Sequence, residues 1–156
     1  MSITLHLGVT EIPYANNPQL SAKQRKKSKA STQTTGDVAE ILEAEYHIMQ
    51  IFFNLHDKGI AKDLESSLEG ALENLLTGAP LGGNAFAEAE SEIEQRFKNF
   101  LTNREMETLG YPGVPTQAAL AGINHRLKHP YKKSNPRRPS FVDTGLYESS
   151  FKAWVD

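Results

Sequence analysis

The sequence contains no cysteine, which excludes a disulfide framework, a cysteine-ligated zinc site and a thiol nucleophile. It also has no long hydrophobic run, and no apolar stretch approaches the roughly 18 residues that span a bilayer. The first residues lack the basic stretch and apolar core of a signal peptide. We therefore expect a protein that is neither exported nor inserted into a membrane.

Charge is spread unevenly along the chain, although the net charge is only −2. Residues 37–107 contain fifteen acids and five bases, whereas 21–30 contain five bases and 125–138 contain six, with no acid in either segment. An acidic middle between two basic segments is typical of subunits that dock through complementary charge. The alternatives are separate solvated faces, or non-specific contact of the basic segments with nucleic-acid phosphates.

The hydrophobic periodicity predicts an α+β fold within a single domain, 1–156. Apolar residues alternate with polar ones over Ser2–Ile12 and again over Phe151–Val155, which predicts two strands that pair in a small antiparallel sheet. Three long amphipathic helices are expected to pack on this sheet, over residues 37–58, 60–76 and 85–109. Their apolar stripes, which include the leucines of 60–76, are expected to form the core. A shorter helix is predicted over residues 117–128.

Two polar segments are expected to lie outside the packed body. Residues 16–35 are rich in Ser, Thr, Lys and Gln and predict a flexible basic loop. Residues 129–140 carry Pro, Lys and Arg with few apolar anchors, and they predict an extended basic connector. Because such a connector has little to pack against in its own subunit, we expect it to reach a neighbouring protein.

Candidate catalytic groups are few. His125 and His129 are four residues apart and can face one metal ion, but the surrounding positive charge opposes a cation. The triplet from Asp143 to Gly145 matches that of retroviral-type aspartic proteases, which need two such aspartates. The structural alternative is that Asp143 or Thr144 caps a short helix and that Gly145 permits the turn. We expect no enzymatic activity, no cofactor and no metal.

The C-terminal stretch resembles a group of tailed-bacteriophage proteins: small head–tail connector, neck and tail-completion proteins. These proteins carry a Pro, a short gap, Asp-Thr-Gly, a Leu and a Ser that leads into a β-strand. The matching residues here are Pro139, Asp143, Thr144, Gly145, Leu146 and Ser149 or Ser150. Residues 124–131 and 135–139 also resemble phage virion proteins, so the likeness covers about the last forty residues.

The resemblance implies a structural virion protein, located in the neck or tail and assembled in the host cytoplasm. Its partners would be copies of itself in a ring, expected to be a hexamer, together with portal or adaptor proteins and tail-tube or tail-terminator proteins. Contact with genomic DNA is a further expectation, and membranes are not expected partners. The alternative function is a DNA-associated or chaperone-like assembly factor that uses its basic loops.

The basic C-terminal segment supplies the predicted docking residues. They are Arg126, Lys128, Tyr131, Lys132, Lys133, Arg137 and Arg138. If they face a neighbour, replacing Arg137 and Arg138 by Glu is expected to abolish assembly and to leave the melting of the monomer unchanged.

Overall fold

The computed structural model describes residues 3–14, 33–80 and 83–156. The expected basic loop at 16–35 therefore lies almost wholly outside the described residues. In chain order the elements are β1 (Leu5–Val9), α2 (Thr35–Tyr46), α3 (Ile48–Leu76), α4 (Ala87–Thr102), the 3₁₀ helix η2 (Glu105–Leu109), α5 (Gln117–Leu120), α6 (Leu146–Ser150) and β2 (Phe151–Val155).

A two-stranded antiparallel sheet joins the two ends of the described chain, as the alternating pattern predicted. Leu5 lies opposite Val155 and Val9 lies opposite Phe151. The alternation has a direct cause, because Phe151 and Ala153 are buried while Lys152 and the ring of Trp154 face solvent. The predicted α+β class, with terminal strands forming the sheet against long helices, is confirmed.

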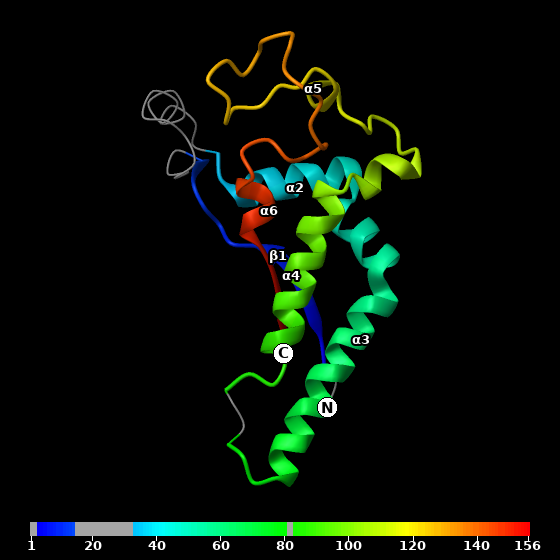
Figure 1. Ribbon diagram of the computed structural model, residues 1–156, viewed down its shortest axis with the longest axis vertical. Helices are drawn as coiled ribbons and strands as arrows, with labels where there is room; N and C mark the ends of the chain where they lie inside the picture. Colours follow the sequence, from blue (N-terminus) through cyan, green and yellow to red (C-terminus); the bar gives the residue numbers. More distant parts are fainter. Residues whose placement is uncertain (1–2, 15–32, 81–82) are drawn as a thin grey trace.

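The core lies where α3, α4 and β2 meet, beside the sheet (Figure 1). Phe97 of α4 stacks on Phe151 of β2, with ring centroids 3.8 Å apart, and Phe52 of α3 meets Phe97 edge-on at 5.1 Å. Such aromatic pairs each contribute about 0.5–1.5 kcal/mol beyond the area that they bury. The final strand therefore completes the core that the two longest helices begin.

The break between the first two helices differs from the prediction. The sequence predicted it near Lys58 and Gly59, but α3 runs through both residues and the break is at His47, in the left-handed conformation with φ 51°. Gly59 has a different role. A Cβ there would lie 3.0 Å from the guanidinium of Arg96, which crosses the helix to pair with Asp63 at 2.6 Å.

The later helices are shorter than predicted. The helix expected over 85–109 ends at Thr102, and a left-handed Arg104, with φ 61°, separates it from η2. The helix expected over 117–128 ends after one turn at Leu120, because Gly122 adopts φ 66°. Left-handed residues end helices, and a single sequence shows such a position plainly only where glycine occupies it.

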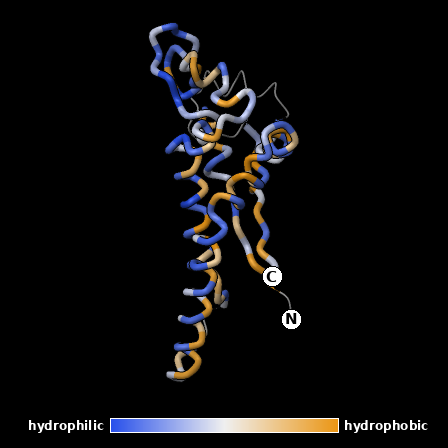
Figure 2. The backbone as a smooth tube through the Cα atoms, turned by 90° about the vertical axis from the view of Figure 1, so that its right-hand side faces the viewer, coloured by the Kyte–Doolittle hydropathy of each residue, from blue (hydrophilic) through white to orange (hydrophobic). Residues whose placement is uncertain are grey.

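The two long helices are unequal in length, and α3 extends past the end of α4. The N–H of Ala89 donates to Ser67 Oγ at 3.0 Å, which fixes the start of α4 beside Ser67. Residues 68–76 of α3 then continue for about 13 Å at 1.5 Å per residue. Figure 1 shows this end of α3 below both strands, and Figure 2 shows hydrophobic and hydrophilic residues alternating along it.

Candidate docking surfaces

The segment expected as an extended connector is a closed loop, which we call the basic loop (residues 122–138). Its neck is Gly122, where a Cβ would lie 2.5 Å from the carbonyl oxygen of Pro136 and 2.6 Å from that of Asn135. The side-chain amide of Asn135 also donates to the carbonyl of His129 at 2.9 Å and to that of Pro130 at 3.0 Å. The loop is therefore held by its own backbone.

Asp143 ties the basic loop to the body of the protein. Its carboxylate accepts the backbone N–H of His125 at 2.9 Å and also pairs with the imidazole of His125. The other ring nitrogen of His125 lies 2.9 Å from the hydroxyl of Tyr131. Asp143 thus acts as a tether, whereas Thr144 Oγ1 accepts the N–H of Leu146, the first residue of α6, at 3.3 Å.

Gly145 makes the turn into α6, with φ 75°. The guanidinium of Arg126 lies directly over it, so that a Cβ at this position would meet Arg126 Nη2. The Nε of Arg126 donates to the carbonyl of Thr144 at 2.5 Å. The predicted turn at Gly145 is therefore present, and Arg126 is one of the groups that pack against it.

Two further arginines of the predicted docking set have partners within their own subunit. Arg138 is half-buried and donates from Nε to the carbonyl of Ile123, and from Nη1 to the carbonyls of Pro139 and Val142 at 3.0 and 2.9 Å. Burial lowers the pKa of Arg138, although nearby Asp143 opposes the change. Arg137 pairs with Glu107. These arginines hold the loop through contacts within their own subunit, and their docking to a neighbour stays a prediction.

Glu107 of η2 binds the segment that follows the basic loop. It accepts the backbone N–H and the hydroxyl of Ser140, both at 2.8 Å, as well as the Arg137 guanidinium. Burial alone would raise the pKa of Glu107, but the hydrogen bonds from Ser140 and the pairing with Arg137 lower it. The carboxylate stays charged and anchors residues 137–140.

The other four predicted docking residues face outward. Lys128, Tyr131, Lys132 and Lys133 are exposed, and Tyr131 is 70% exposed. Residues 128–132 line an open hollow of about 530 Å³. The arginines therefore fix the loop, and the lysines and Tyr131 form its outer surface.

The end of α3 is a second exposed surface, which was not predicted from the sequence. We call it the helical tip (residues 65–76). Leu68, Leu72, Leu75 and Leu76 are 42%, 52%, 59% and 86% exposed. The sequence predicted them as a buried stripe, but α4 starts beside Ser67 and does not extend along them. Three acids, Glu65, Glu69 and Glu73, each lie three residues before a leucine and so on the same side of the helix.

The charge around the tip could have been noticed in the sequence. Residues 63–94 contain eight acids and no lysine or arginine. The fold places this acidic segment at one end of the molecule and the basic loop at the other (Figure 1). The acidic and basic residues that are separated along the sequence are therefore also separated in space.

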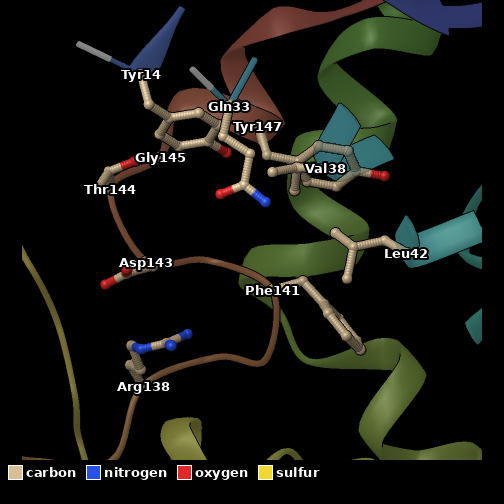
Figure 3. A pocket seen from close by; sticks show the side chains of 10 residues that line it. All are labelled: Tyr14, Gln33, Val38, Leu42, Arg138, Phe141, Asp143, Thr144, Gly145 and Tyr147. Carbon is tan, nitrogen blue, oxygen red and sulfur yellow. The ribbon is translucent and has the colours of Figure 1, made fainter. Parts of the chain in front are cut away.

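An inner cavity of about 250 Å³ lies between α2, α6 and the chain that leaves the basic loop (Figure 3). It is lined by Tyr14, Gln33, Val38, Leu42, Arg138, Phe141, Asp143, Thr144, Gly145 and Tyr147. Burial, with a smaller effect of Asp143, raises the pKa of Tyr14 to about 12, and burial also raises the pKa of Tyr147. Both phenols stay protonated at neutral pH and cannot act as bases.

Figure 3 shows the carboxylate of Asp143 turned away from the two tyrosines. This carboxylate pairs with His125 instead. Among the described residues, no group of three His, Asp or Glu side chains is placed to hold a metal ion. Within the same part of the chain, no helix is long and apolar enough to cross a bilayer. The basic segment 21–30, for which contact with nucleic-acid phosphates was one alternative, lies outside the described residues.

No protein-family model matches this chain, and neither a curated protein nor a solved structure matches it.

Proposed function

We propose that this chain is a structural subunit that assembles with copies of itself into a ring of the head–tail connector, neck or tail-completion kind found in tailed bacteriophages. It would act through surfaces rather than through chemistry at a pocket. Residues 139–151, which resemble that group, include the tether Asp143, the turn at Gly145 and the entry into β2. The likeness therefore falls on residues that hold the basic loop and lead into the last strand.

The observation that carries the proposal is the uncovered helical tip. Four leucines on one side of a projecting helix are between 42% and 86% exposed, so the described residues leave much of their apolar surface unburied. A neighbour that buried them would gain about 1–2 kcal/mol for each leucine, given their exposure. Such projecting apolar surface on a folded protein marks an interaction site.

The first test is the oligomeric state of the purified chain. Light scattering after size-exclusion chromatography, with negative-stain electron microscopy, should find closed rings of one stoichiometry, expected to be six. A wild-type chain that remains monomeric at every concentration would overturn the proposal, as would open aggregates of mixed size.

The second test addresses the place in the virion. In a tailed phage that carries this gene, a nonsense mutation should leave filled heads and finished tails that do not join, and the wild-type protein should restore joining in extracts. Normal tailed particles in the absence of the protein would contradict the neck and tail-completion assignment.

A further inference from the structure

The helical tip has an acidic and apolar surface, and the same chain carries a basic surface with an exposed aromatic ring that complements it. Leu72 and Leu76 form an apolar row, and Glu69 and Glu73 lie one turn from them on the same side. The basic loop lies at the other end of the molecule (Figure 1). Its residues 128–132 form an open hollow with an aromatic ring and three basic or imidazole side chains.

We infer that the helical tip of one copy docks into the hollow of the basic loop on the next copy. This inference rests on the proposed function and names the contact that builds the assembly. The leucines of the tip would pack against Pro130 and Tyr131, and Glu69 and Glu73 would pair with Lys128 and Lys132. Tyr131 suits this role, because its ring is exposed while its hydroxyl is held by His125.

Charge excludes the simpler symmetric contacts. If two tips met each other, the rows Glu65, Glu69 and Glu73 would face each other, and two basic loops would repel in the same way. The same acids disfavour nucleic acid and anionic lipid as occupants of the tip. A tip-to-loop contact pairs unlike charges and covers the leucines at the same time.

The loop is also built to receive a partner without rearrangement. Its neck at Gly122, the tether at Asp143 and the half-buried Arg138 hold its backbone before any neighbour arrives. A surface that is already ordered loses less conformational entropy on binding than a mobile one does. The two ends are different surfaces, so the contact is head-to-tail, and it closes into a ring when the rotation between copies allows it.

Charge reversal tests the pairing. The tip variant carries Glu69→Lys and Glu73→Lys, and the loop variant carries Lys128→Glu and Lys132→Glu. Each variant alone brings like charges together at the contact, so we expect self-association to weaken at least about tenfold in sedimentation velocity. An equimolar mixture of the two variants restores unlike charges at both kinds of contact, and we expect assembly to return.

Matched controls separate local pairing from net charge. Glu88→Lys with Glu92→Lys makes the same charge change at the same spacing on α4, and Lys58→Glu with Lys62→Glu does so on the proximal part of α3. All four residues are exposed, and both control variants should assemble as the wild type does.

Two results would overturn the inference. If the wild type assembles and either reversed variant assembles equally well, the tip-to-loop contact is wrong while the proposed function stands. If neither variant assembles alone and their mixture does not assemble either, the reversed residues of the tip and the loop do not pair with each other. The inference is then also wrong. A wild type that never assembles overturns the proposed function and this contact together.

Discussion

At the scale of single residues, Gly122 is the glycine at which an added Cβ would come closest to backbone atoms of another segment. Its φ of 66° and the carbonyl oxygen 2.5 Å from a would-be Cβ both oppose substitution. We predict that Gly122→Ala lowers the free energy of unfolding by about 1–3 kcal/mol. Urea denaturation measures this change directly.

Gly70 provides the contrast for that measurement. It lies in the exposed part of α3, and a Cβ there would meet nothing within 4 Å. Gly70→Ala should therefore stabilise the protein by about 0.5–1 kcal/mol through helix propensity. If Gly122→Ala behaved in the same way, the closed neck of the basic loop would be wrong.

Glu107 gives a prediction that depends on pH. Its pKa in the folded protein is lowered from the ordinary 4.5, so its contribution to stability is full at neutral pH and disappears as the pH falls through 4.5 and below. We expect Glu107→Gln to lower the free energy of unfolding by about 1–3 kcal/mol at pH 7, with the difference from wild type shrinking in acid.

The comparison needs a carboxylate without such partners. Glu92 is exposed on α4, so Glu92→Gln should change stability by less than about 0.5 kcal/mol. Urea unfolding of both variants and the wild type at a series of pH values checks the prediction. A difference for Glu107→Gln that stays constant down to acid pH would contradict the stated role of the charge.

The sequence could identify Gly145 as a turn residue, because glycine is the default at positive φ. It could not assign Asp143, since a carboxylate before a helix can cap that helix or bond elsewhere. Here the backbone of His125, 18 residues away in sequence, donates to it. The roles of Arg126, Arg137 and Arg138 were equally out of reach, because their partners are carbonyls and a carboxylate that only the folded loop brings near.

At the scale of elements, the junction between α2 and α3 depends on Glu43. Its two carboxylate oxygens accept the backbone N–H groups of Met49 at 2.7 Å and Gln50 at 3.1 Å, in the first turn of α3. These donors have no partner within the helix. We predict that Glu43→Ala destabilises the fold by about 0.5–2 kcal/mol, whereas the exposed Glu40→Ala changes it by less than about 0.5 kcal/mol, both measured by thermal unfolding.

The basic loop is an element whose stability depends on Arg138. We predict that Arg138→Ala costs roughly 2–3 kcal/mol, because it removes hydrogen bonds from a charged group to three carbonyls. Lys132→Ala, on the outer surface, should cost less than about 0.5 kcal/mol. Chemical denaturation distinguishes the two. If Arg138→Ala and Lys132→Ala both changed stability by a small and equal amount, Arg138 would not anchor the loop. The expectation from the sequence, that replacing Arg137 and Arg138 leaves the melting of the monomer unchanged, would then hold.

The strands were the most predictable elements, since a period of two over Leu5–Val9 and Phe151–Val155 has few other interpretations. The helix break was not predictable. Lys58 and Gly59 form an ordinary helix ending in sequence, but Arg96 from the next helix lies over Gly59 and the helix continues. The left-handed turn at His47 is supported by Glu43. Because the residue is not a glycine, the sequence gives no sign of a left-handed conformation there.

At the scale of the whole molecule, the helical tip should matter for assembly and not for folding. We predict that Leu72→Ser with Leu76→Ser changes the melting of the monomer little, because both side chains are more than half exposed. The same change should weaken self-association strongly, as seen by light scattering. Ile60→Ser in the buried part of the same helix, where Ile60 is 2% exposed, should instead destabilise the fold.

Charge patterning predicted two oppositely charged surfaces from the sequence, and Lys128, Lys132 and Lys133 are exposed on the basic loop. It could not show that the leucines of the tip are uncovered. Their helical spacing is the same whether a partner helix covers them or not, and they are exposed because α4 starts beside Ser67 and does not extend along the tip.

The pairing of β1 with β2 also governs when the protein can fold. Phe151 stacks on Phe97, and the strand that carries it pairs with residues near the other end of the chain. Contacts so distant in sequence form late, after the local helical hairpin, because a long loop must close first. A nascent chain on the ribosome therefore cannot complete its aromatic core until its last strand has emerged.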